Sequence, residues 1–249
     1  MTLRAIVFDV DGTLADTERD GHRIAFNQAF EAHGLEWRWD VELYGKLLAV
    51  TGGKERIRHY VELYGKQKPA DFDDLVAELH REKTRRYVEI LEGGKIPMRP
   101  GVKRLLMEAL ERGIRLAIAT TTTPENVTAL LKCSLSPDSE KWFEVIAAGD
   151  IVPKKKPAPD IYFWAMEKLG LNPESCIAVE DSENGIRSSL GAGLKTLVTV
   201  SDYTRNQDFS GAAAVLSDLG EPDSPFGILA GESFGRHYVD VDLLERWHA

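Results

Sequence analysis

The sequence is short of three things: cysteine, long apolar runs and net positive charge. Its two cysteines, Cys133 and Cys176, do not stand in a spacing typical of a metal or redox site, which favours a reducing compartment. No apolar run approaches the roughly 20 residues that a membrane-spanning helix needs. The formal net charge of −9 argues against a general nucleic-acid or membrane-surface binder. An anionic substrate would therefore need positive charge gathered locally.

What the sequence does contain is the composition of an ordinary globular protein, with 43% hydrophobic and 29% charged residues. A chain of 249 residues can bury a full core and has room for one large domain or two. Short apolar runs alternate with helix-like patterns, which predicts a parallel sheet with helices on its faces. The predicted strands are 5–8, 116–120, 145–147, 176–179 and 196–200, and the predicted helices between them are 102–112, 124–132 and 161–169.

This alternation is interrupted once, directly after the first strand. Helix-like segments follow one another there without a strand between them, over residues 22–33 and 41–48, from Gly53 onward, and over 71–91. The predicted fold class is therefore α/β: a doubly wound, Rossmann-like core of residues 1–16 and 97–249, with a small α-helical cap of residues 17–96 inserted. After Gly220 the pattern is weak, and no element is assigned there.

Polar side chains gather where the predicted strands end. Ligands of such sheets bind at the carboxyl ends of the strands, so these side chains are the candidate site. Hard oxygen ligands around two acids that are two residues apart predict Mg²⁺, whose charge would offset the repulsion between them. Taken singly, each segment is more typical of a turn, a helix cap, a strand end or a solvated loop than of a functional site. The residues are Asp9, Asp11, Thr120, Thr121, Thr122, Lys156, Glu180 and Asp181.

In this order along the chain, these segments resemble the haloacid-dehalogenase-like phosphohydrolases. DVDGT is similar to the first motif of that family, which implies that Asp9 is the nucleophile and Asp11 the general acid/base. The resemblance further implies that Thr120 and Lys156 hold the transferring phosphoryl group. It also implies that Mg²⁺ is held by Asp9, by the backbone of Asp11 and by the acidic pair 180–181, and that the reaction passes through an aspartyl-phosphate.

Within that family the sequence is most similar to the CbbY-type sugar-bisphosphate phosphatases, which are associated with Rubisco and the Calvin cycle, and next to the β-phosphoglucomutases. TGGKERI and KKKPAPDIY carry this likeness, which implies xylulose 1,5-bisphosphate as the substrate. One more residue than the family pattern separates the acidic motif from His22, so His22 is either the family histidine or a surface residue of the first cap helix. The substrate-binding positions carried over are Glu18, Tyr44, Lys54, Arg56, Lys83, Thr121 and Thr122.

Several alternatives share these motifs. A phosphosugar mutase or a phosphoglycolate-type phosphatase would use the same residues, and a receiver-type signalling module also uses an acid pair, a lysine and Mg²⁺. A receiver is about half this length and has no helical insertion, so it fits poorly. The expected partner is a small phosphorylated sugar. No binding to nucleic acid or to a membrane is expected, and the protein is expected to be a monomer. The expected location is the bacterial cytoplasm, or the plastid stroma if a transit peptide has been removed.

Overall fold

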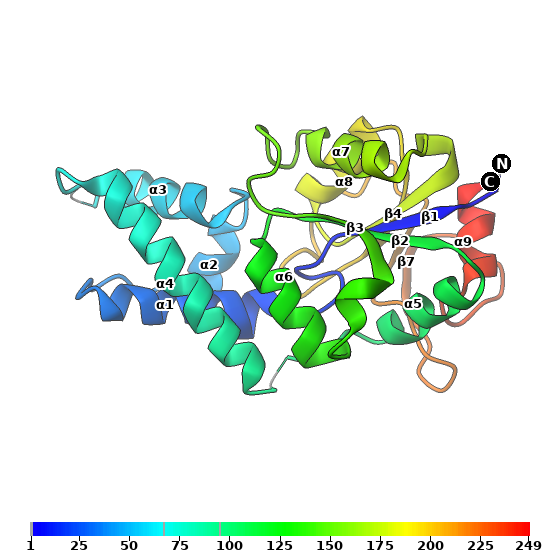
Figure 1. The fold of residues 1–249 in the computed structure, drawn as a ribbon, viewed down its shortest axis with the longest axis horizontal. Helices are drawn as coiled ribbons and strands as arrows, with labels where there is room; N and C mark the ends of the chain where they lie inside the picture. Colours follow the sequence, from blue (N-terminus) through cyan, green and yellow to red (C-terminus); the bar gives the residue numbers. More distant parts are fainter. Residues whose placement is uncertain (1, 67, 95) are drawn as a thin grey trace.

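The chain forms a twisted sheet with helices on both faces, beside a separate group of helices (Figure 1). The computed structural model describes residues 2–66, 68–94 and 96–249. Within these ranges the sheet has seven strands in the order β3-β2-β1-β4-β5-β6-β7, and all neighbours are parallel except β6 and β7. The strands are β1 (Ala5–Phe8), β2 (Arg115–Ala119), β3 (Phe143–Ala147), β4 (Cys176–Glu180), β5 (Lys195–Thr199), β6 (Ala214–Leu216) and β7 (Ile228–Gly231).

The apolar run of β1 is fully buried because helices cover both faces of the sheet at that strand. Ile6 and Phe8 pack on one face with side chains of α5 (Val102–Glu111), α6 (Pro124–Leu130) and α9 (Val241–His248). Ala5 and Val7 pack on the other face against α7 (Asp160–Leu169), and α8 (Glu183–Gly191) covers the part of that face near β5 and β6. The predicted doubly wound α/β fold is confirmed.

The helices between β1 and α5 enclose a core of their own. They are a π-helical turn (Glu18–His22), α1 (Arg23–Ala32), α2 (Val41–Leu47), α3 (Gly53–Leu63) and α4 (Phe72–Glu92). Aromatic side chains such as Phe26, Trp39 and Tyr44 fill the space between them. Residues 67 and 95, which the predicted cap includes, lie outside the described ranges, and we keep the division at 17–96 as a proposal. We call these helices the cap.

Two chain segments join the cap to the sheet, and they run side by side. Ala15 pairs with Met98 in an antiparallel bridge, and the backbone N–H of Arg99 donates to the carbonyl of Leu14 over 2.9 Å. Any motion of the cap relative to the sheet must therefore pass through a short paired ribbon that begins only a few residues after β1.

The segment after Gly220, to which the sequence analysis assigns no element, packs on the core. It contributes the antiparallel edge strand β7 and the helix α9, whose Leu243, Leu244 and Trp247 are buried against the sheet. The Asp240 side chain caps this helix by accepting from the N–H of Leu243 over 2.7 Å. In the described part of the chain, no helix is both long enough and apolar enough to cross a bilayer.

Candidate active site

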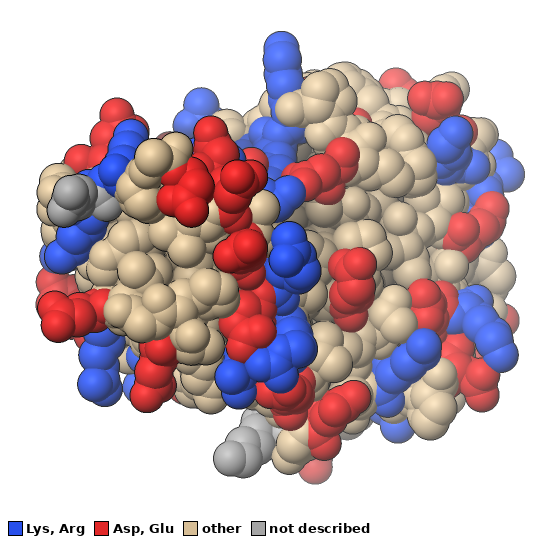
Figure 2. All heavy atoms as spheres, turned by 60° about the vertical axis from the view of Figure 1, so that its left-hand side comes forward, with Lys and Arg blue, Asp and Glu red and all other residues tan. Residues whose placement is uncertain are grey.

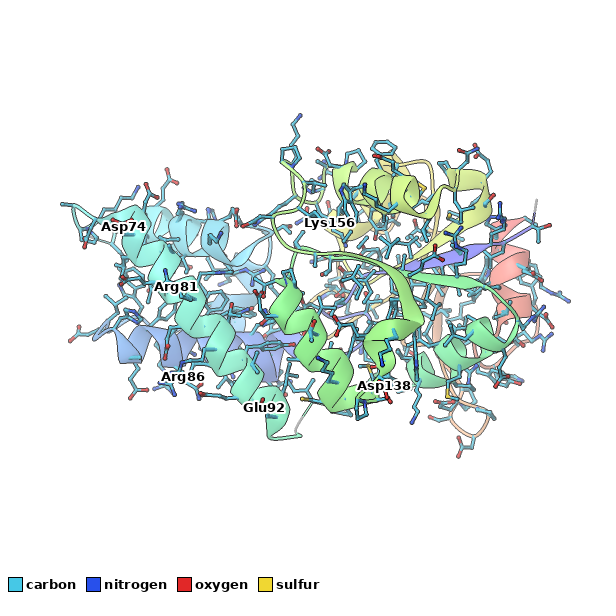
Figure 3. The ribbon with its side chains drawn as sticks, in the orientation of Figure 1. Asp74, Arg81, Arg86, Glu92, Asp138 and Lys156 are labelled. Carbon is cyan, nitrogen blue, oxygen red and sulfur yellow. The ribbon has the colours of Figure 1, made fainter. Side chains whose placement is uncertain are left out.

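Three carboxylates meet at the carboxyl ends of the two central strands. Asp9 follows β1, Glu180 ends β4 and Asp181 comes next, and each offers an oxygen within 4.8 Å of the others. Lys156 reaches them from the loop before α7 (Figure 3). Its Nζ lies 2.7 Å from Asp9 Oδ1 and 2.6 Å from Glu180 Oε1. One buried ammonium thus serves two carboxylates and leaves the cluster with surplus negative charge.

The electrostatics of this cluster favour an additional cation. Burial raises the pKa of Asp9 to about 7 against the opposing effect of Lys156, and the nearby Glu180 raises it further. Burial, followed by the charges of Asp9 and Glu180, also raises the pKa of Asp181 well above its usual range. Burial disfavours the Lys156 ammonium, but the two carboxylates beside it raise the pKa of Lys156 overall. A divalent cation with oxygen ligands would offset the remaining charge.

Two carboxylates of the cluster lie against backbone positions that are glycine. A Cβ on Gly12 would fall 2.1 Å from Asp181 Oδ2, and Gly12 also has a φ of +88°, which favours glycine. A Cβ on Gly185 would fall 1.8 Å from Glu180 Oε2. Glu180 is already engaged, because its Oε1 accepts from Lys156 and from the Tyr162 hydroxyl. The donor set therefore fits a hard cation, with Asp9 and Asp181 as its best-placed carboxylates.

Asp11 points to the cap side of the same site and is held by two cap residues. Its Oδ1 accepts from the Thr17 hydroxyl and lies 2.8 Å from Nε2 of His22. Burial alone would raise the pKa of Asp11, but His22, and after it the Thr17 hydrogen bond, lower that pKa to about 2. His22 in turn is buried and stacks on Tyr87, with ring centroids 3.9 Å apart.

The position of His22 decides the alternative that the sequence left open. His22 ends the π-helical turn Glu18–His22, and such a turn accommodates one residue more than an α-helical turn. His22 is thus a buried partner of Asp11, and the interpretation as a surface residue is wrong. The extra residue between the acidic motif and His22 was the sequence signal for this π-turn. Such turns are frequent at functional sites.

Six of the eight predicted residues of the sheet, without Thr122 and Glu180, and two of the cap line one cavity of about 340 Å³. From the sheet side come Asp9, Asp11, Thr120, Thr121, Lys156 and Asp181, and from the cap come Glu18 and Arg56. A smaller recess next to it shares Asp11, Glu18, Arg56 and Thr121, and adds Lys83 and Thr122. Sequence reasoning missed other lining residues, among them His80, Asn126, Asn184, Ser201 and Tyr203.

Tyr44, one of the predicted substrate-binding residues, is fully buried and lines neither the cavity nor the recess, but it connects two cap residues that do. The Arg56 Nη1 donates to the Tyr44 hydroxyl over 2.8 Å, and that hydroxyl donates to Glu18 Oε2. Lys83 is buried with its Nζ 5.2 Å from the ring centres of both Phe26 and Tyr87. Burial lowers the pKa of Lys83 to about 8, although the neighbouring Asp11 and Glu18 oppose this.

Lys54 is not among the residues that line the cavity or the recess. Its Nζ lies 2.8 Å from Oδ2 of Asp150, on the loop after β3, and it borders a separate open cleft between the cap and the core. Lys155 pairs with Asp150 at 2.9 Å and with Glu55 at 3.0 Å. Figure 2 shows the molecule from the side on which basic and acidic side chains are interspersed near this junction. Lys54 thus pairs with an acidic residue of the core, and its role in substrate binding stays a prediction.

This fold and site define a family of hydrolases. The family model described as haloacid dehalogenase-like hydrolase matches residues 3–193, and the chain belongs to that family. It is an enzyme, and the family that its motifs predict is confirmed.

Its relatives are proteins called CbbY. The chain is 51% identical over 219 residues to Protein CbbY of Rhodobacter capsulatus, covering 88% of this chain and 95% of the relative. It is 42% identical to a CBBY-like protein of Arabidopsis thaliana, covering 88% of this chain and 70% of that protein. A crystal structure of a CbbY variant from Rhodobacter sphaeroides in complex with xylulose-(1,5)bisphosphate is similar at a TM-score of 0.83 and 47% identity, covering 88% and 96% of the two chains.

Proposed function

We propose that the protein is a magnesium-dependent phosphatase whose substrate is a sugar bisphosphate, with xylulose 1,5-bisphosphate as the specific candidate. The observation that carries this proposal is the buried cluster of Asp9, Lys156 and Asp181 at one end of a cavity that has the buried cation Arg56 at its cap side. The similarity to a CbbY variant that binds xylulose-(1,5)bisphosphate supports the choice of sugar.

The carboxylates of Asp9 and Asp181 and the backbone carbonyl of Asp11 would hold Mg²⁺, with Glu180 in its neighbourhood. When bound, the ion supplies positive charge against the phosphoryl oxygens and against the surplus charge of the cluster. The Lys156 ammonium supplies further positive charge to the phosphoryl oxygens, and the Thr120 hydroxyl can donate a hydrogen bond to one of them. Glu180 fixes Lys156 in place, because its Oε1 accepts from that ammonium over 2.6 Å.

Asp9 attacks phosphorus through a carboxylate oxygen, so that a new P–O bond forms to Asp9 while the bond to the sugar oxygen breaks. Asp11 donates a proton to that leaving oxygen. Water then attacks the aspartyl-phosphate, Asp11 takes the proton of the water, and inorganic phosphate leaves. For the first step Asp11 must carry a proton, and the anionic substrate beside it disfavours its carboxylate and so raises its pKa.

The second phosphate of the substrate needs cations of its own. A bisphosphate carries about −4 charge near neutral pH, counting roughly −2 for each phosphate group. Arg56 and Lys83 are buried at the cap side of the cavity and its recess, and both are candidates for this phosphate. Gly52, with a φ of +98°, precedes α3, and the start of a helix favours an anion. Glu18, Thr121 and Thr122 line the space between the two ends and are candidates for the sugar hydroxyls.

Replacement of the proposed nucleophile tests the mechanism. The Asp9→Asn variant should release no phosphate from a sugar bisphosphate in the presence of Mg²⁺, while its circular dichroism and melting temperature show a folded protein. The matched control is Asp20→Asn, because Asp20 is exposed. Appreciable phosphate release by Asp9→Asn would remove Asp9 as the nucleophile.

A further inference from the structure

Arg99 is a buried arginine in the second of the two segments that join the cap to the sheet. Its side chain is 6% exposed, and both of its terminal nitrogens donate to acceptors in the core. The Nη1 donates to the carbonyls of Gly12 and Thr199, the second over 3.1 Å. The Nη2 donates to the carbonyls of Val200 and Ser217 over 2.6 and 2.7 Å. The Nε lies 3.4 Å from Oδ1 of Asp16, which makes an ion pair at the exposed end of the guanidinium.

The acceptors of Arg99 explain why an arginine is buried there. Thr199 ends β5, Val200 follows it, and Ser217 comes directly after β6, so their carbonyls lie where the strand ladders stop. Buried carbonyls without a donor are costly, and a guanidinium can satisfy several of them at once. This explains the hydrogen bonds of Arg99 at the ends of β5 and β6. It does not explain the hydrogen bond to Gly12, which belongs to the loop that carries Asp9 and Asp11.

Two of these contacts lead from Arg99 to Asp181. Gly12, whose carbonyl accepts from Arg99, lies so close to Asp181 that a Cβ on Gly12 would fall 2.1 Å from Asp181 Oδ2. Val200, which accepts from the other end of the guanidinium, directly precedes Ser201, and the Ser201 hydroxyl donates to the same Oδ2 over 3.1 Å. The guanidinium therefore fixes the backbone on two sides of one carboxylate.

We propose that Arg99 is a positioning residue that holds Asp181 in the geometry needed to bind the metal ion, and that it does so from the segment that connects the cap to the sheet. This inference rests on the proposed function, because it takes Asp181 to be a metal ligand. Partners of that kind, which orient a ligand without touching the metal, typically change metal affinity or activity 10- to 100-fold when they are replaced. Because Arg99 is also in the linker, the same contact connects the position of the cap to the metal site.

The test measures Mn²⁺ binding by the full chain, followed through the loss of the free-ion electron paramagnetic resonance signal. Arg99→Lys keeps the charge but cannot reach all of the acceptors, and it should weaken Mn²⁺ binding about 10- to 100-fold. The matched control is Arg104→Lys. Arg104 also holds core carbonyls, those of Val239 at 2.9 Å and Gly220 at 2.8 Å, and among the described residues it makes no hydrogen bond to the loop of Gly12.

Arg104→Lys should lower the melting temperature and leave Mn²⁺ binding as in the wild type. Ser201→Ala tests the second route to Asp181 in a variant that keeps the buried guanidinium, and it should also weaken Mn²⁺ binding. In steady-state assays, Arg99→Lys should need more Mg²⁺ for half-maximal rate, while KM for the sugar bisphosphate at saturating Mg²⁺ stays unchanged.

Three results would overturn the inference. Wild-type Mn²⁺ affinity in both Arg99→Lys and Ser201→Ala would refute it while leaving the proposed function intact. An equal loss in Arg99→Lys and Arg104→Lys would mean that Arg99 acts through general stability. A wild-type protein that binds no Mn²⁺ would refute the proposed metal site itself, and this inference with it.

Discussion

A substitution of Arg56 separates substrate recognition from the chemical step most clearly. It is buried at the cap side of the cavity, donates to Tyr44, and lies 3.8 Å from Oε2 of Glu18 through its Nη1. The reacting phosphate would sit at the other end of the cavity, beside Asp9 and Lys156. The Arg56→Ala variant should therefore lose turnover of a sugar bisphosphate and keep turnover of p-nitrophenyl phosphate, which has no second anion to hold.

The size of the loss follows from the interaction that disappears. A hydrogen bond to a charged group contributes about 1.5–3 kcal/mol. Without it, kcat/KM for the bisphosphate should fall roughly 10- to 150-fold. Arg56→Lys keeps the charge without the planar fork of donors, so its loss should be intermediate. The assay compares phosphate release from xylulose 1,5-bisphosphate with p-nitrophenol release, on protein whose melting temperature is measured alongside.

The same helix supplies a control and a contrast. Arg58 on α3 is exposed and pairs with Asp73, so Arg58→Ala should leave both activities unchanged. Lys54 pairs with Asp150 outside the cavity, and Lys54→Ala should change the bisphosphate reaction far less than Arg56→Ala does. If Arg56→Ala lowered both activities equally, Arg56 would support the fold of the cap and not the second phosphate, and the reasoning for a bisphosphate would fail.

Three further predictions address the cap histidines and the C-terminal helix. The His22→Asn variant should lower kcat about tenfold with KM unchanged, because it loosens Asp11, and an unchanged kcat in steady-state assays would exclude that role. Burial, and next the neighbouring lysines, lower the pKa of His80 to about 3, so the unfolded chain binds a proton below about pH 6.5 that the native protein does not. Stability should fall as pH drops from 6.5, and His80→Asn should remove up to about 2.7 kcal/mol of that loss by pH 4.5. Denaturant unfolding at several pH values measures this, and parallel curves for the two proteins would contradict it. The Leu244→Ala variant should lose about 2–5 kcal/mol of unfolding free energy, and a loss below 1 kcal/mol would mean that α9 is not part of the core.

The sequence predicts the position of the candidate site well because it lies at strand ends. Asp9 and Asp181 each follow a short buried strand, and parallel strands present their carboxyl ends at one edge of the sheet. Once the strands are recognised, these residues must lie close together, whatever the loops do. Lys156 reaches the same edge from a loop, and the structure brings it within 2.7 Å of Asp9.

What the sequence did not reveal depends on partners far along the chain or on local irregularity. His22 reaches Asp11 only through a π-turn, which no periodic pattern predicts. Lys54 pairs with Asp150, which lies 96 residues later in the chain. In the sequence Arg99 is an ordinary linker arginine, because its acceptors at the ends of β5 and β6 lie about 100 residues later or more. The helix α9 is short and follows a loop-rich segment, so its apolar stripe gives a weak signal.

The proposed function requires that this enzyme release phosphate from a sugar bisphosphate by way of Asp9. The most direct measurement is the amount of inorganic phosphate formed per molecule of xylulose 1,5-bisphosphate consumed by the wild-type protein with Mg²⁺. The proposed function predicts one inorganic phosphate for each bisphosphate consumed, and none when the metal is chelated. Consumption of the bisphosphate without phosphate release, as in transfer of the group to another position of the sugar, would contradict the account, and so would a bisphosphate left intact.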